Sequence, residues 1–149
     1  MPTAHVNHPG KGTAILMNLS PQWYNAYRAA GPEAAAKRSV FMTPIHTAGV
    51  APGITLDGGE KAFGAEITYW KQGARTIAFV VSNPEINVSS TGGGNSTGLK
   101  TDTISVTLKF AKGVAGARDE RTNKELGAGR QFKFDWKMNE ALVISFVAL

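Results

Sequence analysis

The stretch TISVTLKF, residues 103–110, is the clearest guide to how this chain folds. Every second side chain in it is apolar, and the residues between them carry hydroxyl or amino groups. The apolar set consists of Ile104, Val106, Leu108 and Phe110. This alternation with period two predicts a β-strand that turns one face to a core and the other to water, as in an antiparallel sheet.

The segments around this stretch repeat the alternation. Residues 65–71 and 75–81 flank a glycine-containing turn, which predicts a β-hairpin. Residues 114–118 indicate a weaker strand, residues 132–136 an alternating one, and residues 141–147 a nearly continuous apolar one. Short strands separated by turn residues at regular intervals predict an antiparallel β-sandwich of the immunoglobulin-like kind.

The N-terminal part of the chain has a different pattern. Residues 12–19 predict a short buried strand, and helix-forming residues follow at 22–30 and 34–47. Pro44 lies inside the second helical stretch and is expected to kink or end it, because proline has no N–H to donate. Gly49 follows that stretch and is expected to cap its C-terminus.

These patterns divide the 149 residues into two parts. Residues 1–51 are expected to form a strand-helix α/β segment, which is too small to cover both faces of its own strand. Residues 52–149 are expected to form the β-sandwich. The predicted fold class is therefore mainly β, an antiparallel β-sandwich preceded by a short strand-helix segment.

Composition and charge limit the classes of function. The chain carries 16 basic and 11 acidic residues, a net charge of +5, but the basic residues are dispersed, so nucleic-acid binding is not expected. It has no cysteine, which excludes disulfides and thiolate chemistry. No apolar run approaches the roughly 18 residues of a membrane helix, and the N-terminus has no signal-peptide core. We therefore expect no contact with a membrane, and the sequence predicts no compartment.

The titratable residues show no pattern typical of catalysis or metal binding. The histidines are His5, His8 and His46, whereas a structural zinc site needs four ligands in paired spacing. We expect exposed histidines, no metal and no cofactor. The carboxylates are spread over predicted loops and wet faces, although glycoside hydrolysis needs two of them opposed across the substrate. The chain is accordingly not expected to be an enzyme by itself, and no catalytic residue is predicted.

The aromatic residues are the best candidates for ligand contact. On the first strand of the predicted hairpin, Trp70 shares a face with Glu66 and Thr68. Ile67 and Tyr69 lie on the opposite face, which is expected to pack on the core. An exposed tryptophan can stack on the apolar face of a sugar ring while polar neighbours hydrogen-bond the sugar hydroxyls. The alternative is that a neighbouring segment covers Trp70, since tryptophan is usually largely buried.

A second aromatic cluster belongs to the N-terminal part. Trp23, Tyr24 and Tyr27 are spaced as on one face of a helix. Trp23 and Tyr24 are therefore further candidates for carbohydrate contact, and the alternative is that the cluster packs its helix onto the sandwich. Trp136 continues the apolar alternation of its strand and is expected in the core.

Five short motifs stand in an order that matches a known family. They are GKGTAILMNL at 10–19, TAGVAP at 47–52, a hairpin at 66–81, a D-x-x-T-x-K-x-L-G turn at 119–127 and an apolar strand at 140–146. Together they resemble the C-terminal region of the β-galactosidases of glycoside hydrolase family 42. In that family the first two motifs belong to an amidotransferase-like domain that mediates trimer formation, and the others belong to a small β-sandwich. The resemblance spans nearly the whole chain.

The resemblance implies that the chain is the C-terminal tail of a larger glycosidase-like polypeptide, or a stand-alone relative. The catalytic glutamates of the family lie upstream of this region, so no catalytic residue carries over. The leading hypothesis is a non-catalytic accessory β-sandwich of a carbohydrate-active enzyme, structural or glycan-contacting. Two alternatives stay open: a carbohydrate-binding module that uses Trp70, and an assembly subunit whose strand at 12–19 pairs with another chain. The expected partners are carbohydrate, an upstream catalytic domain or further copies of the chain.

Overall fold

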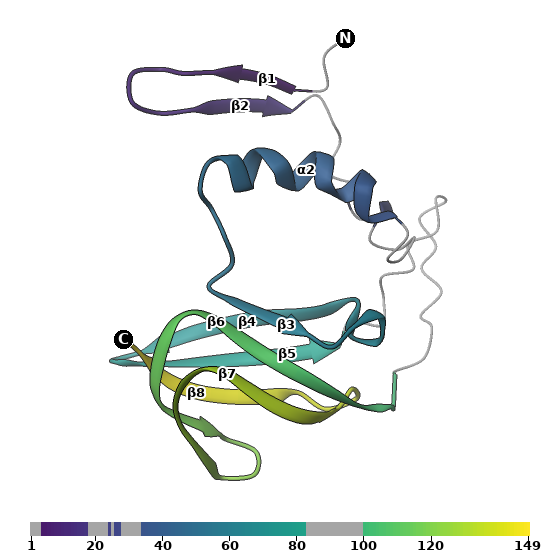
Figure 1. Cartoon of the computed structure of the whole chain (residues 1–149), viewed down its shortest axis with the longest axis vertical. Helices are drawn as coiled ribbons and strands as arrows, with labels where there is room; N and C mark the ends of the chain where they lie inside the picture. Colours follow the sequence, from purple (N-terminus) through teal and green to yellow (C-terminus); the bar gives the residue numbers. More distant parts are fainter. Residues whose placement is uncertain (1–3, 18–23, 25, 28–33, 83–99) are drawn as a thin grey trace. The chain divides into compact units, whose positions relative to one another are not determined.

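The described residues fall into two compact units, one before Pro52 and one from Pro52 onward (Figure 1). The computed structural model describes residues 4–17, 24, 26, 27, 34–82 and 100–149. The N-terminal unit contains a β-hairpin and a helix, and the C-terminal unit contains a six-stranded antiparallel sheet. No helix among the described residues is both long and apolar enough to cross a bilayer.

The sheet of the C-terminal unit has the strand order β3-β6-β8-β5-β4, and β7 pairs with β6 outside this path. A short 3-10 helix, η2, follows β3. The elements are β3 (Ile54–Asp57), η2 (Glu60–Ala62), β4 (Ala65–Gln72), β5 (Arg75–Ser82), β6 (Thr103–Asp119), β7 (Lys124–Lys137) and β8 (Leu142–Ala148). The predicted hairpin is confirmed: β4 and β5 pair along their whole length, and Gly73 adopts the positive φ of 59° that a tight turn requires.

The long strand β6 belongs to both layers of the sandwich. Its first half pairs with β3 and with the end of β7, whereas its second half pairs with β8 and with the beginning of β7. The register between β6 and β7 shifts three times between Lys109 and Arg118. Such bulges bend a strand without ending its pairing. The two strands predicted at 103–110 and 114–118 are therefore one bent strand.

The core lies between the two layers and is built from alternate residues of the strands. Its largest fully buried aliphatic side chains are those of Val80, Val106, Leu108 and Ile144. Phe110 meets Phe132 and Phe146 edge to face, with ring centroids 5.8 and 4.9 Å apart, a favourable geometry for aromatic pairs. Trp136 is buried, as predicted, and its Nε1–H donates to the carbonyl oxygen of Glu140 at 2.7 Å.

The predicted fold class is confirmed: the chain is mainly β, with an antiparallel sandwich-like sheet and one short helix before it. One detail differs from the immunoglobulin arrangement, in which the two sheets are separate. Here the layers share β6 and form one continuous hydrogen-bonded sheet. β3, β4 and β7 each pair with a single neighbouring strand, so all three are edge strands of that sheet.

The N-terminal unit contains a hairpin of β1 (Ala4–Asn7) and β2 (Ala14–Met17), followed by α2 (Ala35–Thr47). The expectation of a buried strand at 12–19 is wrong, because the hairpin has no further strand partner among the described residues and the Leu16 side chain is 71% exposed. The helix expected over 22–30 falls largely outside the described residues.

Helix α2 follows the predicted range closely. It continues through Pro44, so the proline does not end it, although its missing N–H cannot donate to the preceding turn. The predicted glycine cap is confirmed, since Gly49 has a φ of 77° and its N–H donates to the carbonyl oxygen of His46 at 2.9 Å. The N–H of Val50 donates to Ile45 at 3.2 Å, which completes a Schellman motif.

Candidate functional site

Strand β4 carries three of the residues that are predicted from the sequence to contact carbohydrate. Its pairing register with β5 places Trp70 opposite Ile77, Thr68 opposite Phe79 and Glu66 opposite Val81. We call this side of β4, β5 and β8 the outer face, because Ala78 and Val80 on the other side of β5 are fully buried in the core. The three candidate residues of β4 thus share one face, as their spacing predicts.

Trp70 is the most exposed large aromatic side chain on this strand, at 71%. Of the two interpretations open from the sequence, the structure favours the exposed tryptophan over the covered one. Thr68 is also exposed, and Glu66 is half-buried. The three side chains therefore form a row on one strand, with the aromatic ring at its end nearest the hairpin turn.

Tyr69, on the opposite face, departs from its predicted burial. The expectation that it packs in the core is wrong, because its side chain is 60% exposed. The physical reason is its position: β4 is an edge strand, and all residues from Thr68 to Gln72 are exposed. Ile67, nearer the middle of the unit on the same face as Tyr69, is half-buried and packs against the core.

Apolar side chains continue the outer face from β4 across β5 and β8. Phe79 and Ile77 are half-buried, and Val81 is exposed. The register with β8 brings Val143 opposite Phe79 and Ser145 opposite Ile77. A row of apolar side chains therefore lies directly beside the row formed by Glu66, Thr68 and Trp70.

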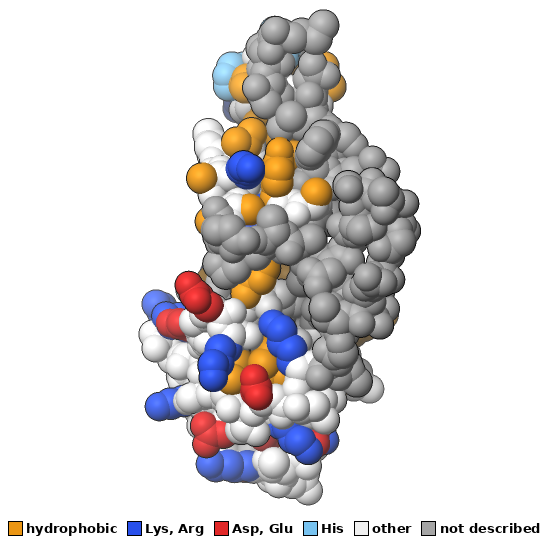
Figure 2. Space-filling model, turned by 90° about the vertical axis from the view of Figure 1, so that its right-hand side faces the viewer, with side chains coloured by type: hydrophobic (Ala, Val, Ile, Leu, Met, Phe, Trp, Pro, Cys, Tyr) orange, Lys and Arg blue, Asp and Glu red, His pale blue; other side chains and the backbone are white. Residues whose placement is uncertain are grey.

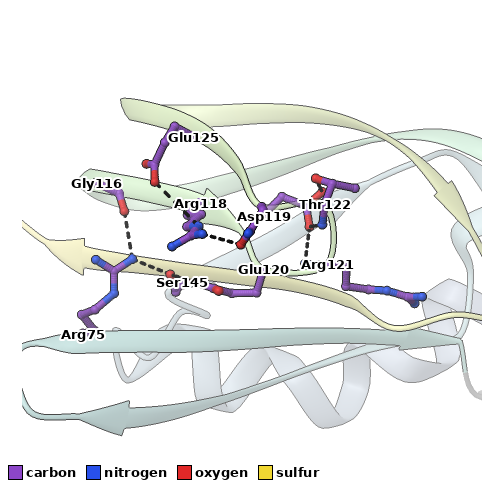
Figure 3. A network of polar contacts seen from close by, with 10 residues as sticks. Arg75, Gly116, Arg118, Asp119, Glu120, Arg121, Thr122, Glu125 and Ser145 are labelled. Carbon is purple, nitrogen blue, oxygen red and sulfur yellow. Dashed lines mark hydrogen bonds and ion pairs between the residues drawn. The ribbon is translucent and has the colours of Figure 1, made fainter.

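A polar network fixes one end of the outer face (Figure 3). Arg75 donates from Nη2 to the hydroxyl of Ser145 and to the carbonyl oxygen of Gly116, the latter at 3.1 Å. Ser145, which is 2% exposed, donates in turn to Oε1 of Glu120. Because these residues come from β5, β8 and the end of β6, the network ties three parts of the sheet together.

Several carboxylates of the C-terminal unit are committed to cations. Lys109 lies 2.7 Å from Asp57, and its hydrogen bond and charge lower the pKa of that carboxyl. The hydrogen bond from Lys137, with the charge of Arg121 at 2.9 Å, lowers the pKa of Glu140. A general acid that works at neutral pH needs the opposite shift. These two carboxylates are therefore suited to surface ion pairs and not to proton donation.

A third carboxylate holds the turn after β6 (Figure 3). Asp119 is 8% exposed and accepts hydrogen bonds from the N–H of Arg121 at 3.0 Å and from the hydroxyl of Thr122 at 2.8 Å. This is the side-chain-to-backbone geometry by which aspartate stabilises turns. Next to it, Arg118 pairs with Glu125 at 3.7 Å across the hairpin.

Charge is mixed over the surface that Figure 2 presents. Basic and acidic side chains of the C-terminal unit alternate there, without a continuous patch of one sign. Among the residues that the structure describes, no three histidine, aspartate or glutamate side chains are grouped to hold a metal ion. His5, His8 and His46 are exposed, and His8 shares a hydrogen bond of 3.2 Å with the hydroxyl of Thr13.

The aromatic candidates of the N-terminal unit have a different environment. Trp23 lies outside the described residues. Tyr24 is half-buried, and its ring meets Phe41 of α2 edge to face with centroids 5.6 Å apart. Tyr27 is tilted against the same ring at 6.2 Å. Both tyrosines thus contact α2 within the N-terminal unit, and the packing of the cluster onto the sandwich stays a prediction.

The C-terminal unit also contains an apolar cavity with a volume of about 350 Å³, which the sequence did not predict. Its lining residues come from five parts of the chain, including Ile54, Tyr69, Phe110, Val114 and Phe146. Each of them fits the pattern of an ordinary strand residue. No local signal in the sequence could have marked them as a group.

No family model and no curated protein matches the chain. Among solved structures, a catalytic mutant of Gan42B, a GH42 β-galactosidase from G. stearothermophilus, matches with a TM-score of 0.48 and 12% identity, over 98% of this chain and 16% of that one. Gan42B itself matches with a TM-score of 0.48 and 13% identity, over 97% of this chain and 15% of that one. This chain thus spans a small part of either structure, and its membership of that family stays a prediction.

Proposed function

We propose that this chain is a non-catalytic accessory β-sandwich of a carbohydrate-active enzyme, and that it contacts carbohydrate through Trp70 on the outer face of β4. The observation that carries the proposal is the 71% exposure of the Trp70 side chain on a regular strand. A pyranose ring has one apolar C–H face, which stacks on an indole, and a rim of hydroxyl groups. Thr68 and Glu66 supply polar groups for such a rim from the same face.

An exposed tryptophan has an energetic cost that a ligand would offset. Aromatic side chains bury about 150–250 Å², and at about 25 cal/mol per Å² such burial is worth roughly 4–6 kcal/mol. Large exposed apolar groups that adjoin one another mark interaction sites. Trp70 adjoins Ile77, its direct cross-strand partner, which is followed on the same face of β5 by Phe79 and Val81.

The carboxylates support the non-catalytic part of the proposal. Asp57 and Glu140 have lowered pKa values because of their lysine and arginine partners. Asp119 accepts hydrogen bonds from the turn after β6 and so stabilises that turn. Each of these side chains has a structural role, and the lowered pKa values of Asp57 and Glu140 are opposite to the raised pKa that a glycosidase acid needs.

The decisive variant is Trp70→Ala, tested by affinity electrophoresis in gels that contain soluble β-galactan, β-glucan or xylan. Loss of one stacking contact should weaken binding about tenfold or more, which corresponds to about 1.4 kcal/mol, while the melting temperature stays nearly unchanged. Tyr69→Ala is the matched control, because Tyr69 is an exposed aromatic residue of the same strand on the opposite face. The proposal fails if Trp70→Ala unfolds the protein or if both variants bind equally well.

A second candidate function, assembly, is favoured by the N-terminal unit. The described part of this unit exposes large apolar side chains and buries only Ala34. The exposed set is Val6 at 49%, Leu16 at 71%, Val40 at 45%, Ile45 at 41% and Val50 at 58%. An isolated two-stranded hairpin is marginally stable in water. We infer that a second copy of the chain covers this unit.

Light scattering after size exclusion tests the assembly candidate directly. The chain should be larger than a monomer at high concentration, and Leu16→Glu should shift it towards the monomer. Val81→Glu, an exposed apolar position of the C-terminal unit, is the matched control and should leave the mass unchanged. A strict monomer at all concentrations contradicts assembly by this unit without affecting the role of Trp70.

A further inference from the structure

The apolar cavity lies at the open seam of the C-terminal sheet. Its walls include Ile54 at the start of β3 and Tyr69 on β4, the strands at the two ends of the strand order. These edges line one cavity although β3 and β4 are not hydrogen-bonded to each other. Phe110, Val114 and Phe146 of the buried core also line it, so the seam opens directly onto core side chains.

The topology explains why the cavity exists. The sheet curls around its core, but closure into a barrel would require β3 to pair with β4, and the strand order ends at both of them. Small residues of the corner of β6 and the end of β8 keep the seam open. Ala111, Gly113 and Ala148 line the cavity with no side chain larger than a methyl group.

Two lysines give the cavity a charge. Lys71 of β4 and Lys112 of the β6 corner line it and are exposed. Within the described residues neither lysine has a carboxylate partner, in contrast to Lys109 and Lys137, which pair with Asp57 and Glu140. The remaining lining residues with polar side chains are Tyr69 and Thr76. The cavity is thus lined mainly by apolar side chains, and Lys71 and Lys112 give it positive charge.

We propose that this cavity binds a small amphipathic anion, with an apolar tail against Phe110 and Phe146 and a single carboxylate held by Lys71 and Lys112. The volume of about 350 Å³ lies at the lower end of the range for small-molecule sites. Apolar walls with a few polar groups at fixed positions are the usual composition of such sites. The site lies on the side of β4 opposite Trp70, so it is independent of the carbohydrate proposal.

The first test uses displacement of the fluorescent anion 1-anilinonaphthalene-8-sulfonate from the full chain by hexanoate, octanoate and decanoate. Each added CH₂ should tighten binding about fourfold until the cavity is full. 1-Octanol should bind several-fold more weakly than octanoate at low salt, and the difference should shrink as salt is added. Equal affinities for octanol and octanoate, or no dependence on chain length, would overturn the proposal.

Substitutions of lining residues test whether octanoate binds in this cavity. Lys71→Gln with Lys112→Gln should weaken octanoate binding by up to about fivefold for each lysine, whereas Lys124→Gln, which removes a charge from a distant turn, should not. Ala148→Trp should abolish binding by filling the opening. If Ala148→Trp proves unfolded by thermal melting, the lysine pair decides alone.

Two outcomes separate this proposal from others. Trp70→Ala should leave octanoate binding unchanged, so a failure of the carbohydrate proposal does not affect this one. Sedimentation with phosphatidylglycerol vesicles without any binding of monomeric octanoate would show that the lysines serve a membrane surface instead, and would overturn the proposal. The proposal would also be overturned if Lys124→Gln weakened octanoate binding as much as the combined Lys71→Gln and Lys112→Gln substitutions.

Discussion

Gly58 offers a sharp test of the packing between β3, η2 and the core. A Cβ atom added there would lie 2.7 Å from Cβ of Ala62 and 2.7 Å from Cγ1 of Val106. Val106, on the central strand β6, is 1% exposed, and Ala62 is 9% exposed. Both neighbours are closely packed, so they cannot move away from an added methyl group. Gly58→Ala should therefore destabilise the C-terminal unit through steric overlap.

The expected magnitude follows from two opposing effects. Overpacking of a core costs about 1–3 kcal/mol, and the smaller backbone entropy of alanine in the unfolded chain offsets about 0.4–1 kcal/mol. The free energy of unfolding should fall by about 1–2 kcal/mol. For a unit of this size, the melting temperature should fall by roughly 4–8 °C per kcal/mol.

Urea denaturation, followed by tryptophan fluorescence, measures this effect, because unfolding exposes the buried Trp136 to water. Gly53→Ala is the matched control, because a Cβ at Gly53 meets nothing within 4 Å. The control should be unchanged or slightly stabilised. Equal denaturation midpoints for the two variants would refute the close packing of Gly58 against Val106 and Ala62.

Two further predictions concern surface features. The pKa of Asp57 is lowered from 3.8 by Lys109, so the stability from this pair is present above that value and is lost as pH falls through the lowered pKa. Asp57→Asn should therefore melt slightly below the wild type near neutral pH and at the same temperature in strong acid; a difference that persists in acid would contradict this. Asn123 has a φ of 60°, so Asn123→Val should cost about 1–2 kcal/mol while Asn123→Gly is nearly neutral, and thermal melts that rank the two variants in the reverse order would contradict the turn geometry.

The sequence alone determined most of the local structure of the C-terminal unit. Alternating apolar residues place the strands and their faces, because side chains of a strand point to opposite sides in turn. The same rule puts Trp70, Thr68 and Glu66 on one face, which the register with β5 confirms. The roles of the glycines at the hairpin turn and after α2 could also be predicted from the sequence, because positive φ angles favour a residue without a side chain.

Only the tertiary structure decided how exposed these residues are and what surrounds them. Tyr69 has the pattern of a core residue, yet it is exposed because β4 is an edge strand. The same holds for Leu16, whose strand pairs only with β1 among the described residues. The bend of β6 and the cavity beside it depend on bulges and on two edges that stay unpaired. Periodicity reports which way a side chain points from its own backbone, whereas burial depends on residues that are far away in the sequence.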